Sequence, residues 1–121
     1  MLGALFEDDV RAVYVRGGLS DYHSVLERAF CYLPHDVVVP GVLTTGDLCD
    51  VAAALAPRPL RLEGMVDGLN RRLAAESLAR KFERTQTAYQ ATNARARLRL
   101  DAEPASGAVD LRWLADCLKG D

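Results

Sequence analysis

The fold is decided by one stretch of the chain, residues 47–68, which reads DLCDVAAALAPRPLRLEGMVDG. Asp47 is a typical helix cap, and the alanine-rich run after it predicts a short helix that ends before Pro57, because a proline ring disfavours helical geometry at the preceding residue. A strand over residues 59–64, bounded by proline and glycine, follows. Asp67 lies just past this strand. Open α/β sheets bind their ligands at the carboxyl ends of parallel strands, so Asp67 marks the expected functional edge.

Two further segments read as strands. Residues 10–16 alternate and contain β-branched side chains, whereas residues 94–101 alternate small or apolar residues with arginine. The arginine pattern is typical of an edge strand with one solvated face. Between the strands the helical periodicity predicts helices over residues 20–30, 48–55, 70–91 and 110–118.

The order of these elements predicts the fold class. Strand, helix, loop, helix, strand, helix, strand, helix is the order of crossovers on a parallel sheet. We therefore expect an α/β fold in which a small three-stranded parallel sheet is flanked by helices. Residues 1–121 are expected to form one domain, and residues 32–46 a long loop of the kind that is usually functional or part of an interface.

Each predicted helix has an apolar face that is expected to turn inward. In the first helix this face carries Tyr22, Val25, Leu26 and Phe30 at helical spacing. In the long helix and the last helix the expected inward residues are Leu73, Leu78, Phe82 and Tyr89, then Leu111, Leu114 and Leu118.

The charge and composition exclude several classes of partner. The net charge of −2 provides no basic surface for nucleic acid or for an anionic membrane. No apolar run is long enough to span a membrane, and the three scattered cysteines form no disulfide pattern, so a cytoplasmic protein with reduced thiols is expected. The first residues resemble the tail of a helix, which suggests a piece of a larger protein.

A parallel sheet of three strands is a poor free-standing unit. Parallel sheets are normally covered on both faces, and so short a sheet leaves two open edges. We therefore expect the chain to form a homo-oligomer, a dimer or larger, or to pair with a missing half.

Two segments carry a resemblance to a known family. One is residues 32–43, YLPHDVVVPGVL, and the other runs from Gly46 through the Ala-Pro-Arg-Pro turn to Asp67. Together they resemble the C-terminal part of an α/β-hydrolase, nearest to the acetyl-xylan-esterase-like and dienelactone-hydrolase-like proteins, over about residues 4–91. The resemblance implies that the sheet is equivalent to the last third of that fold. It also implies that Asp67 corresponds to the acid of a Ser-Asp-His triad, which orients the histidine.

The chain also departs from that family. It contains no Gly-x-Ser-x-Gly nucleophile turn, and residues 101–109, where the triad histidine would follow the last strand, contain no histidine. A conventional serine esterase mechanism within this chain is therefore not expected. Asp67 has an alternative role as a turn former, since Asp-Gly is a common turn pair.

The remaining candidates are histidines and their neighbours. His35, beside Asp36, is a candidate general base or metal ligand, and the alternative is a hydrogen-bonded histidine in a structural loop. His23, on the first helix, is expected at the surface. A divalent metal such as zinc, held by His23, His35 and Asp36 at a dimer interface, is a further hypothesis, although no ligand spacing of a known motif supports it.

Three functions follow from these observations. The first is weak ester or phosphoester hydrolysis at a site assembled in an oligomer, with Asp67 and His35 as the catalytic candidates. The second is a zinc-dependent hydrolase at a dimer interface. The third is a non-catalytic remnant that folds and associates with itself.

Overall fold

The computed structural model describes residues 1–105 and 107–119, for residues 107–110 the backbone alone. Its sheet contains three parallel strands in the order β1 (Val13–Arg16), β2 (Leu60–Glu63) and β3 (Leu98–Asp101). The strands run side by side in register, with Leu60 between Val13 and Leu98. The expected α/β fold with a small three-stranded parallel sheet flanked by helices is confirmed, although each strand is shorter than the predicted segment.

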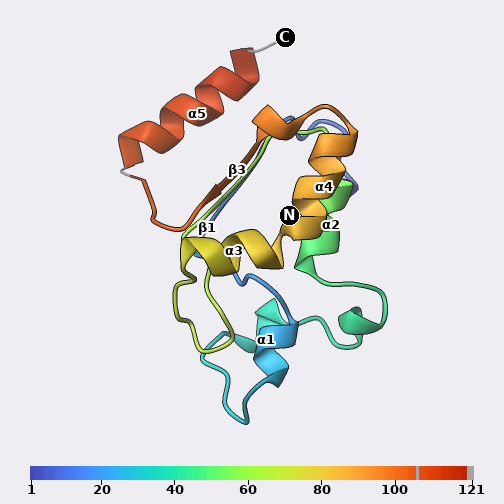
Figure 1. The fold of residues 1–121 in the computed structure, drawn as a ribbon, viewed down its shortest axis with the longest axis vertical. Helices are drawn as coiled ribbons and strands as arrows, with labels where there is room; N and C mark the ends of the chain where they lie inside the picture. The colour runs from blue at the N-terminus through green and yellow to red at the C-terminus, as the bar shows by residue number, and fades with distance from the viewer. Residues whose placement is uncertain (106, 120–121) are drawn as a thin grey trace.

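Helices lie on both sides of this sheet. In Figure 1, α2 and α4 lie on one side and α5 on the other, whereas α1 and the chain after it lie below α3. The helices span His23–Leu26 (α1), Leu48–Ala54 (α2), Ala75–Lys81 (α3), Glu83–Ala91 (α4) and Gly107–Lys119 (α5), and 3-10 turns lie at Leu2–Leu5, His35–Val37, Val42–Thr44 and Arg95–Arg97.

The core forms between the sheet and the helices α2, α3 and α4. Leu60 and Leu62 of β2 are fully buried there against apolar side chains that include Leu55, Phe82 and Tyr89. The hydroxyl of Tyr89 donates a hydrogen bond to the carbonyl of Arg58 at 2.6 Å, and burial raises the pKa of this phenol to about 12. Burial of Leu78, Phe82 and Tyr89 was expected from the helical periodicity and is confirmed.

Helix α2 begins as the sequence predicts. The carboxylate of Asp47 accepts a hydrogen bond from the N–H of Leu48 at 2.7 Å, and the carboxylate of Asp50 accepts one from the N–H of Asp47 at 2.9 Å. These contacts are part of a capping box, which satisfies amide groups that a helix start leaves without partners. Further along α2, the carbonyl of Cys49 accepts a hydrogen bond from the buried hydroxyl of Thr85, which joins α2 to α4.

The single helix predicted over residues 70–91 is wrong. The chain forms two helices that meet at the fully buried Phe82, whose φ of −105° and ψ of 24° interrupt the helical geometry. The residues before Ala75 are not helical, because the N–H of Leu73 donates to the carbonyl of Met65 and Val66 bridges Arg72, which forms a hairpin. These tertiary contacts override the local helical preference.

The expected inward faces of the first and last helices also need correction. Helix α1 spans four residues, and both Leu26 (69 % exposed) and Phe30 (75 %) lie at the surface. In α5, Leu111 (71 %) and Leu118 (63 %) are exposed as well. The predicted inward face of the first helix is wrong, because α1 ends at Leu26, Phe30 lies outside it, and the residue that α1 buries is Ser24. Periodicity also does not show whether another element covers a helix face.

Candidate functional site

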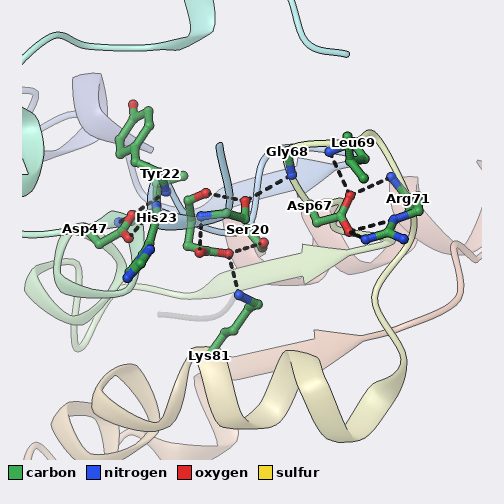
Figure 2. Close-up of polar contacts among 12 residues, drawn as sticks. Ser20, Tyr22, His23, Asp47, Asp67, Gly68, Leu69, Arg71 and Lys81 are labelled. Atoms are coloured by element: carbon green, nitrogen blue, oxygen red, sulfur yellow. Dashed lines mark hydrogen bonds and ion pairs between the residues drawn. The ribbon is translucent and has the colours of Figure 1, made fainter. Parts of the chain in front are cut away.

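Asp67 lies at the tip of the hairpin that follows β2, at the edge where the sequence placed it. Its Oδ1 accepts hydrogen bonds from the backbone N–H groups of Leu69 (2.9 Å) and Arg71 (3.0 Å). Its Oδ2 accepts the Nε of Arg71 at 3.0 Å and faces Nη2 of the same guanidinium at 2.8 Å. Figure 2 shows that these contacts close a ring around the carboxylate. Both oxygens are therefore engaged within one short turn.

These contacts also determine the charge of Asp67. Burial by itself would raise the pKa of the carboxyl group, but the backbone N–H and guanidinium of Arg71 and the N–H of Leu69 outweigh burial, so the pKa lies below its ordinary value. Asp67 is thus a stable carboxylate at neutral pH. The acid of a catalytic triad is also charged, but its carboxylate pairs with an imidazole. In this chain Oδ2 of Asp67 pairs with the guanidinium of Arg71 instead.

A buried polar cluster lies beside this hairpin. Asp21 (8 % exposed) accepts hydrogen bonds from the hydroxyl of Ser20 at 2.6 Å and from the N–H of Ser24 at 2.8 Å, and its Oδ2 lies 2.8 Å from the ammonium of Lys81. The hydroxyl of Ser24 in turn accepts the N–H of Gly68 at 3.0 Å. The cluster, drawn in Figure 2, therefore fixes α1 against both α3 and the hairpin.

The sequence interpretation missed this cluster. Burial alone would raise the pKa of Asp21, but Lys81, Ser20 and Ser24 together hold it below the ordinary value. The available signal was the spacing of Asp21 and Ser24, in which a carboxylate accepts the N–H three residues later, as a helix cap does.

The histidines lie elsewhere. His23 is exposed on α1, and its backbone N–H donates to Oδ2 of Asp47 at 3.2 Å. His35 and Asp36 lie in an exposed 3-10 turn. Within the described residues, no three His, Cys, Asp or Glu side chains converge as a metal site requires. A metal held by His23, His35 and Asp36 therefore stays a prediction that needs ligands from a second copy.

Asp47 has a second role that the sequence did not reveal. Besides capping α2, its Oδ1 accepts the N–H of Tyr22 at 2.7 Å. One carboxylate therefore holds the starts of α1 and α2 together, as Figure 2 shows for Asp47, Tyr22 and His23. This contact also fixes one end of the long loop.

The sheet face opposite the core is polar. In each strand the residues between the core positions carry polar groups, so that Tyr14, Arg61 and Arg99 form one row and Arg16, Glu63 and Asp101 the next. Arg61 (4 % exposed) and Glu63 (0 %) are buried and lie 2.9 Å apart. The ring of Trp113 from α5 lies 6.3 Å from that of Tyr14, on this same face. The alternation in Leu60-Arg61-Leu62-Glu63 was the signal for this arrangement.

An apolar groove lies between α1 and the long loop. Its volume is about 300 Å³. We use the term apolar groove for the surface formed by Tyr22, Val25, Leu26, Val38, Val39, Pro40, Gly41, Val42, Leu43 and Thr44. Asp47 holds its two walls together through the start of α1.

Comparisons of the chain with protein-family models, with curated proteins and with solved structures give no match. The resemblance to α/β-hydrolases thus stays a prediction drawn from the residues. Among the described residues no single helix is long and apolar enough to cross a membrane, and His35–Thr44 with Leu48–Ala54 meets that test only as a pair bent by 81°.

Proposed function

We propose that this chain is a non-catalytic α/β module, derived from an α/β-hydrolase, that functions by associating with a second copy of itself. The observation that carries this proposal is the state of Asp67. Each hydrogen bond and ion pair that its carboxylate makes in the described part of the chain comes from its own hairpin, through Leu69 and Arg71. The acid that the hydrolase resemblance assigns to catalysis instead stabilises a turn.

Self-association is favoured by the surface of the chain. Six large apolar side chains between residues 26 and 43 are exposed, in a protein with a small core. Exposed apolar clusters of this kind mark interaction sites, because water contact with them is unfavourable. The short parallel sheet adds to this argument, since its outer strands β1 and β3 have one neighbour each.

Weak ester hydrolysis is the competing function. It would require Asp67 to exchange Arg71 for an imidazole, and the guanidinium of Arg71 is 63 % exposed, so it is the weaker of the contacts that hold Asp67. Such an exchange would take His35 or a histidine of another chain. An assay of ester hydrolysis therefore distinguishes the non-catalytic module from a weak esterase.

Two measurements test the proposed function. Light scattering coupled to size exclusion, over a range of loading concentrations, is expected to give at least twice the monomer mass at the higher concentrations. Hydrolysis of an activated ester such as p-nitrophenyl acetate is expected to equal the buffer background. A chain that stays monomeric throughout, or one whose hydrolysis exceeds background and falls on Asp67→Asn, would overturn the proposal.

A further inference from the structure

Two adjacent hollows lie where the strands of the sheet begin, and they share part of their lining. Their volumes are about 400 Å³ and about 250 Å³. In Figure 1 this end of the sheet is the one nearest the C-terminal end of α5. We use the term arginine cleft for the two hollows together, whose charged and aromatic lining residues are Arg11, Arg58, Arg97, Arg99, Trp113, Asp8 and Asp116.

The topology of the sheet brings the arginines to this end. Arg11, Arg58 and Arg97 come just before β1, β2 and β3, and the beginnings of parallel strands lie at one edge. The guanidinium of Arg97 donates from Nη1 to the carbonyl of Pro57 at 3.3 Å, which ties it to the entry of β2. That of Arg58 donates to the carbonyl of Glu7 at 3.1 Å. Neutral carbonyl groups therefore orient both side chains without cancelling their charge.

The cleft carries an excess of positive charge, although the chain as a whole has a net charge of −2. Of its two carboxylates, Asp8 is fully exposed and lies 3.8 Å from Nη2 of Arg58, so it belongs to that guanidinium. Arg97 and Arg99 then remain with Asp116 as their one acidic neighbour in the lining. The smaller hollow therefore favours an anion.

Trp113 gives the same hollow an aromatic wall. It is the one tryptophan of the chain and lies half-buried on α5, with its ring 6.3 Å from that of Tyr14. Aromatic rings pack against planar groups in offset or tilted arrangements, whereas guanidinium groups bind phosphate oxygens through paired hydrogen bonds. An indole beside two guanidiniums therefore suits a ligand that carries both a planar group and a phosphate.

We infer that the arginine cleft binds a small phosphate ester, with its planar group against Trp113 and its phosphate between Arg97 and Arg99. An apolar cavity of about 150 Å³ holds benzene, so the hollow of about 250 Å³ has room for a ring and one phosphate group. Asp116 repels any anion there, so a ligand that the indole also holds is favoured over phosphate alone. The inference adds a ligand to the proposed module and does not depend on self-association.

Calorimetric titration of the full chain with phenyl phosphate tests this inference, with inorganic phosphate and phenol as the two halves of that probe. Tryptophan fluorescence of the same samples reports contact with Trp113. Phenyl phosphate is expected to bind saturably and to change the fluorescence. Each half is expected to bind at least about tenfold more weakly, because it lacks either the ring contact or the charged hydrogen bonds.

Four variants identify the groups that hold the phosphate. Arg97→Gln and Arg99→Gln are each expected to weaken the binding of phenyl phosphate about tenfold, as loss of a hydrogen bond to a charged group does. Asp116→Asn should strengthen binding. The matched control is Arg80→Gln, which alters a guanidinium of α3 that is 73 % exposed and lines neither hollow, and it should leave binding unchanged.

Circular dichroism melting verifies that each variant is folded. Arg99→Gln decides the test if Arg97→Gln unfolds through loss of its contact with Pro57. A wild-type chain that shows no saturable binding of phenyl phosphate would overturn the inference. Binding that Arg80→Gln weakens as much as Arg99→Gln would overturn it as well, because the phosphate would then respond to the charge of the whole surface.

Discussion

The carboxylate of Glu63, on the central strand, accepts a hydrogen bond from the backbone N–H of Ala105 at 2.9 Å. Ala105 lies in the connection between β3 and α5, and its carbonyl accepts a hydrogen bond from the guanidinium of Arg16. The same Glu63 oxygen also accepts the hydroxyl of Tyr14 at 2.9 Å. A single buried charge thus holds the start of the last helix over the polar face of the sheet.

Replacing Glu63 by glutamine is expected to lower the free energy of unfolding by about 1–3 kcal/mol, because the buried Arg61 loses the carboxylate at 2.9 Å and keeps only its ion pair with Asp101 at 3.0 Å among the pairs described here. Glu103→Gln is the control. The Glu103 side chain is 80 % exposed and pairs with Arg72 at 2.8 Å, so its loss is expected to cost at most about 1 kcal/mol. Urea unfolding measures both, and similar costs would contradict the role of Glu63.

The acid stability of the chain is expected to depend on Asp21. Because the pKa of Asp21 in the folded chain lies below its ordinary value of 3.8, its contribution is complete above that pH and is lost as the pH falls through the lower, folded value. Unfolding of the Asp21→Asn variant should therefore depend less steeply on pH below 4. Asp8→Asn, at a fully exposed carboxylate, serves as the control. Parallel pH profiles for wild type and Asp21→Asn would contradict this prediction.

Asp67→Asn is expected to affect stability and not hydrolysis. The substitution removes the ion pair with Arg71 and one charged acceptor from the hairpin, at a cost of about 1–2 kcal/mol in the free energy of unfolding. Hydrolysis of p-nitrophenyl acetate should stay at background for both proteins. An esterase rate in the wild type that the variant lacks would restore Asp67 as a triad acid.

Gly68 is expected to tolerate no side chain. A Cβ at this position would lie 2.6 Å from the backbone carbonyl oxygen of Ser24, and backbone cannot move aside cheaply. Gly68→Ala should therefore lower the melting temperature by several degrees, as overpacking of a close contact does. Gly3→Ala, which meets nothing within 4 Å, should leave it within a degree or two. Equal melting curves would mean that α1 does not contact the hairpin in solution.

Chelation separates the metal hypothesis from apolar association. If exposed apolar side chains form a dimer, the dissociation constant measured with EDTA should equal that measured with added zinc. If His23, His35 and Asp36 of two copies held zinc, EDTA should dissociate the dimer and the variant His35→Ala should bind less zinc. Elemental analysis of the dimer peak measures its zinc content independently.

The fold was largely predictable because its boundaries have strong local signals. Asp47 caps α2, and Gly64 ends β2 at a φ of 57°, a conformation that glycine favours. The break at Phe82 had no such signal, since phenylalanine is acceptable within a helix and tertiary packing alone sets its conformation. Residues 95–97 were predicted as strand but form a 3-10 turn before β3.

The candidate site was predictable in position only. The sequence placed Asp67 after the central strand. Whether its carboxylate pairs with a histidine or with Arg71 depends on the geometry of the turn, which residue spacing does not reveal. Phe30 was predicted on the inward face of the first helix, but α1 ends at Leu26 and Phe30 lies exposed beyond it. Sequence periodicity states which residues share a face, and the fold alone decides whether that face is covered.

The arginines near the outer strand β3 limit what the chain can assemble into. Arg99 of β3 is exposed, and so are Arg95 and Arg97 of the 3-10 turn before it. Two such edges brought together would bring these guanidinium groups near one another, and this repulsion disfavours growth of the sheet from chain to chain along β3. The chain can therefore expose apolar side chains without its sheet extending into filaments along β3.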